Sequence, residues 1–171
     1  MFSYKSLTLR KLAKKDLKLL FELKQESWFG THHVTIVNDT DQERWFDNLD
    51  RHPHQPGQLF LIAEVAEVPV GLFKVTSIDW VNRQADAAWD IFKDYRGKGL
   101  GKDLVAAGTR FAFEFLNLHR LNAEILETNI VSQKCAMAAG YEKEGCKRQA
   151  IFKNDHYINS WMFGALQGSE I

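Results

Sequence analysis

Apolar and polar positions recur with two different periods along the chain, and each change of period marks a new element. Polar and apolar residues alternate over residues 6–12, which predicts a strand, whereas apolar residues near a helical period over residues 15–26 predict a helix. A capping-box sequence that starts at Thr40 predicts a second helix over residues 41–50. The segment between the two helices, residues 27–39, is irregular.

The rest of the chain predicts strands and helices in a regular order. The order of elements becomes β-α-α-β-β-β-α-β-α-β-β, which fits one domain over residues 1–171 of the α/β (α+β) class, with a mixed sheet flanked by helices. The predicted elements after the second helix are strands over 58–65, 70–78 and 84–92, a helix over 99–117, a strand over 121–127, a helix over 130–139, and strands over 141–152 and 156–166.

Composition narrows the classes of protein. Apolar residues make up 45% of the chain and charged residues 26%, which is typical of a soluble globular domain. The 22 Lys and Arg residues balance 22 Asp and Glu residues, so bulk charge indicates neither a nucleic-acid nor a membrane partner. Without a membrane-length apolar run or a signal-peptide core, we expect a cytoplasmic protein. Two cysteines are too few for a disulfide framework or a zinc site, and no metal is expected.

A glycine-rich turn joins the strand over residues 84–92 to the helix over residues 99–117. Glycines let the backbone approach a ligand closely, and a helix start offers unpaired N–H groups and positive potential. Three cations, Arg96, Lys98 and Lys102, add formal charge, so the turn predicts a phosphate or pyrophosphate ligand. The spacing differs from both the phosphate loop of nucleotide hydrolases and the dinucleotide fingerprint.

The spacing Arg96-x-x-Gly99-x-Gly101 resembles a signature of the GNAT superfamily of acyl-CoA-dependent N-acetyltransferases. Asn129, which follows a predicted strand and begins a predicted helix, resembles the second signature of that superfamily. The C-terminal tail is similar to the branch that contains the ribosomal-protein-alanine N-acetyltransferases. That branch also holds enzymes that acetylate nucleotide-linked amino sugars and polyamines. The resemblance is strong from about Phe60 onward and weak before it.

This resemblance implies acetyl-CoA as the co-substrate and a mostly antiparallel sheet in which two parallel strands splay apart. The pantetheine arm would lie between the strands that end at Phe92 and Glu127, bonded by backbone groups of Asp90, Ile91 and Phe92. The pyrophosphate would lie on the N–H groups of the glycine-rich turn, and Asn129 would bond the arm near the thioester. The residues expected to hold the cofactor are Ile91, Phe92, Arg96, Gly97, Lys98, Gly99, Leu100, Gly101, Lys102 and Asn129.

The reaction that the resemblance implies is attack of a neutral amine on the thioester, after which the leaving thiolate needs a proton. Many family members place a Tyr seven residues after the signature Asn, but that position is Ala136 here. The ribosomal-alanine branch relies on a Ser three residues after the Asn, which makes Ser132 the candidate acid. The alternative for Ser132 is a role in capping or lining the start of the helix.

Several residues remain as candidates for the general base that removes the amine proton. The branch places a Glu at the position of Ile151, so that assignment does not carry over. Asp90 and Glu127 stand near the ends of the two splayed strands. His32 and His33, in the irregular segment over residues 27–39, are further candidates because a histidine has a suitable unperturbed pKa. Deprotonation through water, without a single base, is a further alternative.

The acceptor is expected to be a protein N-terminus or a small-molecule amine, with a nucleotide-linked amino sugar or a polyamine as alternatives. The balanced charge argues mildly against a polycation. An acyl-CoA sensor without turnover is the alternative from another class, and family members often form dimers, which leaves a homodimer open. The candidates for acceptor binding are Trp28, His32, His33, Trp80 and Tyr157.

Overall fold

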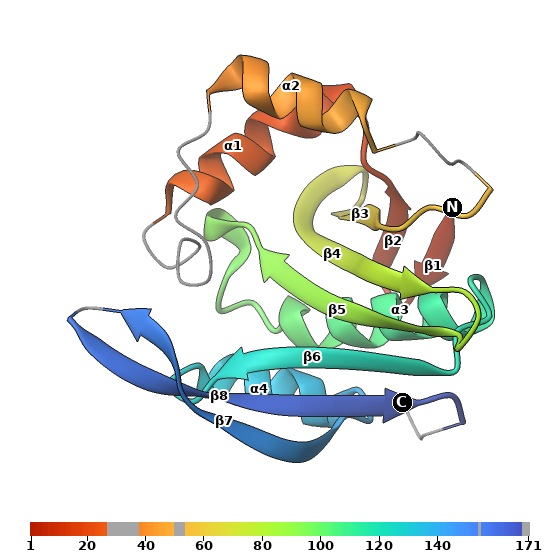
Figure 1. The fold of residues 1–171 in the computed structure, drawn as a ribbon. Coiled ribbons are helices and arrows are strands. Elements are labelled where there is room, and N and C mark those ends of the chain that lie inside the picture. Colours follow the sequence, from red (N-terminus) through yellow and green to blue (C-terminus); the bar gives the residue numbers. More distant parts are fainter. Residues whose placement is uncertain (27–37, 50–53, 154, 169–171) are drawn as a thin grey trace.

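The computed structural model describes residues 1–26, 38–49, 54–153 and 155–168, and these form a sheet with four α-helices (Figure 1). The sheet has the strand order β1-β2-β3-β4-β5-β6-β8-β7. Its strands are β1 (Phe2–Tyr4), β2 (Leu7–Lys11), β3 (Leu59–Val65), β4 (Val68–Asp79), β5 (Gln84–Ile91), β6 (Arg120–Leu126), β7 (Glu142–Lys153) and β8 (His156–Leu166). The helices are α1 (Leu17–Gln25), α2 (Asp39–Asp47), α3 (Leu100–Glu114) and α4 (Ile130–Ala138), with 3₁₀ turns at Lys14–Asp16 and Lys93–Tyr95.

Strands β5 and β6 form the parallel pair of an otherwise antiparallel sheet. Their pairing begins at Gln84 opposite Arg120 and ends at Asp86 opposite Asn122. Beyond that point β5 continues along β4 and β6 continues along β8, so the two strands separate. The fold class predicted from the sequence, including the splayed pair, is confirmed.

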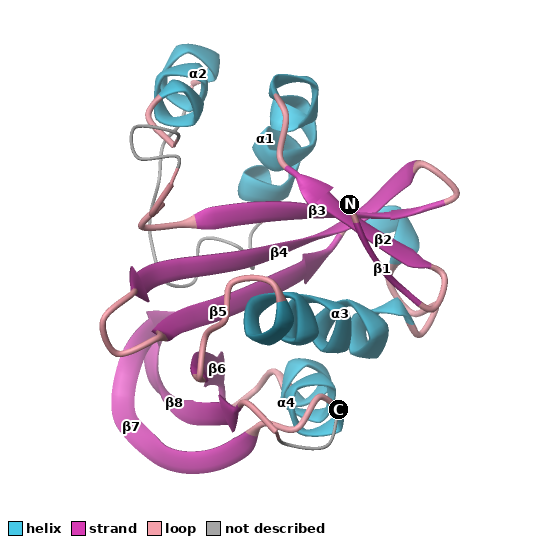
Figure 2. Cartoon of the chain, turned by 90° about the vertical axis from the view of Figure 1, so that its right-hand side faces the viewer, coloured by secondary structure: helices cyan, strands magenta, loops and turns pink. Residues whose placement is uncertain are grey.

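Helices cover both faces of the sheet, with α1 and α2 on one side and α3 and α4 on the other (Figure 2). Apolar side chains from both faces are removed from water, which is the main favourable term in folding. The larger core lies between the sheet and α3, where Leu104, Val105 and Ala107 are fully buried. The smaller core lies beneath α1 and contains Leu12, Leu20, Leu23, Ile62, Leu72 and Phe92.

A buried ionic cluster fixes the start of α1 against the sheet. Arg10 on β2 donates to both carboxylate oxygens of Asp16, at 2.6 and 2.8 Å, and to Glu64 on β3 at 2.7 Å. Burial acts to raise the pKa of Asp16, but the hydrogen bonds from Arg10 and from the Ala13 amide hold it below its usual value. The cluster therefore anchors the helix whose far end reaches the site described below.

Two local predictions were wrong. Strand β1 was missed because three residues carry too little alternation, and the tight turn after it, with Lys5 at φ 51°, has no glycine to mark it. Helix α2 begins at Asp39 rather than Asp41, since Asn38 is the N-cap and its side chain accepts from the Asp41 amide at 2.9 Å. Asn is preferred at an N-cap at least as strongly as Thr, and here Asn38 rather than Thr40 takes that position.

A glycine in α3 lets an aromatic ring of the sheet rest directly on the helix backbone. A Cβ added at Gly108 would lie 2.3 Å from two ring carbons of Phe73, far inside van der Waals contact. Phe73 lies opposite Trp89 in the β4–β5 register, and their rings stack at 6.3 Å with an interplanar angle of 12°. The position of Trp89 therefore depends on this contact.

We predict that Gly108→Ala lowers the free energy of unfolding by about 1–2 kcal/mol. Ala favours a helix by up to about 1 kcal/mol over Gly, but overpacking a core costs about 1–3 kcal/mol and the clash is severe. Urea denaturation would measure the change. Gly57→Ala is the control, because its added Cβ would meet nothing within 4 Å, and an equal loss in both variants would contradict the prediction.

Candidate active site

The glycine-rich turn lies between β5 and α3, as the sequence predicts. Gly97 and Gly99 have φ angles of 75° and 79°, in the left-handed region that favours glycine, and Gly99 is the N-cap of α3. A Cβ at either position would meet nothing within 4 Å, so space is open above the loop. The first N–H groups of α3 lack intrahelical partners, and with Lys98 and Lys102 exposed beside them the turn can bind an anion.

Arg96 has a different environment from the one expected of a simple phosphate ligand. Its Nε donates to the carbonyl of Ile91 at 2.9 Å, and its Nη1 pairs with Glu26 at 2.7 Å. The side chain thus braces the turn against the last residue of β5 and against the C-cap of α1. Its charge stays next to the anion site while its hydrogen bonds hold the site in shape.

The backbone groups of β5 that face the gap are not all the expected ones. The Phe92 amide donates to Val70 at 3.0 Å, so it faces β4. Because alternate residues of an antiparallel strand face opposite neighbours, Asp90 also turns its backbone toward β4. The residues whose backbone groups turn toward the gap are then Trp89 and Ile91. Of the three expected residues, Ile91 turns its backbone toward the gap, where its carbonyl already accepts from Arg96. Asp90 and Phe92 turn theirs toward β4, so the expectation is corrected for these two.

Asn129 and Ser132 lie together at the start of α4. Asn129 is the N-cap, and its Oδ1 accepts from the Ser132 amide at 3.1 Å. The Ser132 hydroxyl is half-buried and accepts from Nε1 of Trp89 at 3.0 Å. Ala136 lies one turn further along the helix and is fully buried, so the structure leaves no room there for the family's tyrosine without rearrangement.

Both carboxylates considered as general bases are already engaged. Asp90 is 5% exposed, lies on the face covered by α1 and α2, and pairs with Lys74 at 2.9 Å. Glu127 accepts from the backbone amide of Asn159 at 2.7 Å and from its side chain at 3.0 Å. Glu127 therefore holds β8 against the end of β6, and Asp90 balances a largely buried cation.

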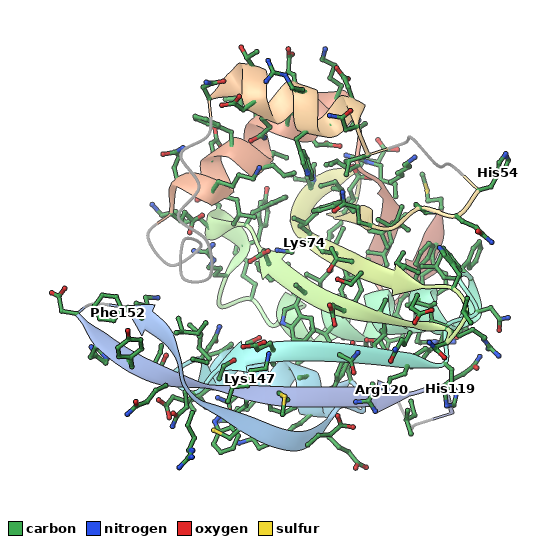
Figure 3. The ribbon with its side chains drawn as sticks, in the orientation of Figure 1. His54, Lys74, His119, Arg120, Lys147 and Phe152 are labelled. Atoms are coloured by element: carbon green, nitrogen blue, oxygen red, sulfur yellow. The ribbon has the colours of Figure 1, made fainter. Side chains whose placement is uncertain are left out.

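The predicted acceptor residues are spread over the molecule. Tyr157 is 62% exposed and packs on Phe152 with 5.1 Å between ring centroids, near the tip of the β7–β8 hairpin. This tip extends past the end of β6, on the side where β5 and β6 separate, and Figure 3 labels Phe152 there. Trp28, His32 and His33 lie outside the described residues.

Trp80 lies at the opposite end of the sheet from the gap, which corrects its assignment to the acceptor mouth. It follows β4, whose Asp79 pairs with Gln84 at the start of β5, roughly 20 Å along the strand from the glycine-rich turn. Its Nε1 donates to the Pro56 carbonyl at 3.1 Å, and it lines a cavity of about 450 Å³ together with His54, which Figure 3 shows far from Phe152.

Sequence reasoning missed two lysines on the face covered by α1 and α2. Lys74 on β4 faces α1 and α2 (Figure 3), and Lys24 on α1 lies with its Nζ 4.9 Å from the ring centroid of Trp45. Burial and the nearby charge of Lys74 lower the pKa of Lys24. In the sequence, Lys24 is an ordinary polar position of a predicted helix. That it lies near a second cation, from a distant segment, cannot be predicted from the sequence.

The described residues contain neither a metal-binding cluster nor a membrane-spanning helix. There, no group of three or more His, Cys, Asp or Glu side chains could hold a metal ion. Within the same ranges, no helix is both long enough and apolar enough to cross a bilayer.

Comparison with known proteins agrees with the geometry. Residues 6–142 match the family model described as an acetyltransferase (GNAT) domain. The chain is 26% identical to the spermidine N(1)-acetyltransferase of Escherichia coli K12, covering 91% of this chain and 83% of that protein. It is 24% identical to the ribosomal-protein-serine acetyltransferase of the same organism, covering 96% and 95%. A spermidine N-acetyltransferase structure from Vibrio cholerae, with CoA and spermine, superposes with a TM-score of 0.86 at 22% identity, covering 97% and 98%.

A splayed parallel pair beside a glycine-rich turn is the arrangement of an acyl-CoA-dependent transferase. The chain belongs to the GNAT acetyltransferase family, since its model spans most of the sequence. It is an N-acetyltransferase that uses acetyl-CoA as its acyl donor.

We predict that Gly99→Asp weakens acetyl-CoA binding about tenfold more than Gly99→Asn does. Both side chains suffer the same left-handed backbone, but only Asp brings a negative charge to the anion site, and like charges in contact are costly. Calorimetric titration with acetyl-CoA measures both affinities, with thermal unfolding as the check on folding. Wild-type affinity in the Asp variant would refute the phosphate-binding role of this turn.

Proposed function

We propose that this enzyme transfers the acetyl group to a single primary amine, at a protein N-terminus or on a small molecule that is not a polycation. The observation that carries the choice of acceptor is the pair of lysines, Lys24 and Lys74, beside the separated end of β5. The acetyl transfer itself follows from the family; the acceptor class and the roles of the residues below are our assignment.

The cofactor would lie along the gap between β5 and β6. Its pyrophosphate would rest on the N–H groups of residues 97–102, near the ammonium groups of Lys98 and Lys102. Its pantetheine arm would pass where pairing stops after Asp86, next to the gap-facing backbone of Ile91 and Trp89. The thioester would then approach the start of α4.

The chemistry starts when the neutral amine nitrogen attacks the thioester carbonyl carbon. The carbon–sulfur bond then breaks, and sulfur keeps the electron pair as a thiolate. The Ser132 hydroxyl is the proposed donor of a hydrogen bond, and of the proton, to that sulfur, and water returns to Ser132 a proton in place of the one it gave. Because Asp90 is paired with Lys74 and Glu127 with Asn159, we assign removal of the amine proton to water at the mouth of the gap.

The acceptor preference follows from charge. Lys24 and Lys74 bring two ammonium groups together on the face covered by α1 and α2, close enough that burial and the charge of Lys74 lower the pKa of Lys24. A polyamine brings several positive charges to this surface, and like-charge proximity selects against such a partner. An acceptor with one amine and neutral or anionic neighbouring groups avoids that cost.

A polyamine is the second candidate, and a specific finding favours it. Two of the relatives compared above are named as spermidine acetyltransferases, and one of them was solved with spermine. The similarity of the ribosomal-protein-serine relative is close to theirs, so identity does not decide between the acceptors.

Thiol release from acetyl-CoA against a panel of amines tests the acceptor class. The panel holds peptides with free N-termini, nucleotide-linked amino sugars, simple monoamines and spermidine. We expect kcat/KM for the best single amine to exceed that for spermidine by at least about tenfold.

The variant Lys24→Met tests the charge. It keeps the apolar stem over Trp45 and removes the charge, so it should reduce the ratio of kcat/KM for the best single amine to that for spermidine. Spermidine as the best acceptor, with no effect of Lys24→Met, would refute the preference. Tight acetyl-CoA binding without thiol release for any amine would favour the alternative that the protein is an acyl-CoA sensor without turnover.

We predict that Ser132→Ala lowers kcat about 10- to 100-fold while the affinity for acetyl-CoA stays within about twofold of wild type. The variant loses the proposed proton donor but keeps the Asn129 cap, because the cap uses the backbone amide. Steady-state thiol release measures kcat, and calorimetry measures the affinity. Ser3→Ala, on exposed β1, is the control, and wild-type kcat in Ser132→Ala would remove Ser132 from the mechanism.

A further inference from the structure

The indole of Trp89 bridges β5 and α4 at the place where β5 and β6 separate. The pairing of β5 with β6 ends at Asp86, three residues before Trp89. The Trp89 ring lies on the side of the sheet that carries α4, and its Nε1 donates to Ser132 Oγ at 3.0 Å. The Trp89 side chain, on the strand that borders the gap, thus holds the Ser132 hydroxyl at the start of α4.

Two ring contacts fix the plane of this indole. It stacks on Phe73, and it meets the ring of Tyr141 edge-on, with 5.8 Å between centroids and an interplanar angle of 61°. Tyr141 is itself buried, and its hydroxyl bonds to Thr109 on α3 at 3.2 Å. Phe73 rests on Gly108 of the same helix. The indole N–H therefore has a fixed direction, with α3 as its support.

The direction of this hydrogen bond decides what the hydroxyl can do. An indole nitrogen is a donor only, so it occupies a lone pair on Ser132 Oγ and cannot accept the hydroxyl hydrogen. Among the described residues, the Ser132 hydroxyl donates to no protein acceptor, and the Ser132 amide is used by Asn129. A donor on the oxygen also stabilises negative charge there, which makes the O–H a better donor.

We infer that Trp89 is a positioning residue, which holds the Ser132 hydroxyl so that its hydrogen is available to the leaving sulfur. This inference rests on the proposed role of Ser132 and adds to it the residue that orients it. During breakdown of the tetrahedral intermediate, the carbon–sulfur electron pair goes to sulfur, and the oriented O–H meets the charge that develops there. The indole makes no contact with the sulfur and keeps its own proton.

A double-mutant cycle between Trp89 and Ser132 tests this. Trp89→Phe keeps a ring against Phe73 and Tyr141 but removes the N–H, so we expect kcat to fall about 3- to 10-fold, the size of one hydrogen bond. The KM for acetyl-CoA and the melting temperature should stay near wild type. In Ser132→Ala, the further change Trp89→Phe should have little additional effect on kcat, since the two residues act through one hydroxyl.

Trp161→Phe is the matched control, because Trp161 lies on β8 opposite Ile125 and has no hydrogen bond to Ser132. It should leave kcat unchanged. Wild-type kcat in Trp89→Phe, or an undiminished effect of Trp89→Phe in the Ser132→Ala background, would overturn the inference. A parallel fall in melting temperature and rise in KM at constant kcat would show a structural role instead, and would also overturn it. If Ser132→Ala itself has wild-type kcat, the proposed role of Ser132 fails, and the inference fails with it.

Discussion

The site depends on one constraint, which is that the parallel pairing of β5 and β6 stops after Asp86 and Asn122. Past that point each strand keeps its other neighbour, so β5 stays extended along β4 and β6 stays extended along β8. The backbone of β5 beyond Asp86 is therefore held by β4 on one side and has no strand partner on the other, where Arg96 bonds the Ile91 carbonyl. A ligand with amide groups can add to such an edge as a further strand would. The glycine-rich turn and the start of α4 both lie at the end of this gap, because each follows directly from one of its two strands.

Buried charges shape the face covered by α1 and α2. Arg10 pairs with both Asp16 and Glu64, which anchors the start of α1 against the sheet. Asp90, in contrast, faces Lys74, and the ammonium of Lys24 lies close to that pair. Removing one member of such a pair leaves an uncompensated charge, which costs more than the pair contributes. For this reason Asp90 is better understood as the partner of Lys74 than as a free base.

Much of the fold could be predicted from the chain because its signals are local. The period of apolar positions predicted α3 and the strands from β3 onward, and the glycine spacing predicted the turn before Leu100. Strand β1 and the Asn38 cap were missed or misplaced, since a three-residue strand and two equivalent caps carry little information. Trp80 was misplaced for another reason: its position in a turn does not say at which end of the sheet that turn lies.

The partners of the site residues could not be predicted, because each joins segments that are far apart in the sequence. Trp89 reads as one more core residue in an apolar strand, and only the three-dimensional arrangement brings its N–H to Ser132. Glu127 is a second example. Its carboxylate was a candidate base in the sequence, and in the structure it accepts two hydrogen bonds from Asn159. The sequence predicted a site at the glycine-rich turn and the start of α4, and the structure shows which side chains there already have partners.

The bond between Arg96 and Glu26 has a thermodynamic consequence. Glu26 is the C-cap of α1, so the Arg96 guanidinium joins the glycine-rich turn to the end of that helix. A phosphate that drew Arg96 toward itself would weaken its bond to Glu26. An acceptor that contacted Glu26 would then change the affinity of the turn for phosphate, and the phosphate would change the affinity for that acceptor by the same factor, whichever of the two bound first.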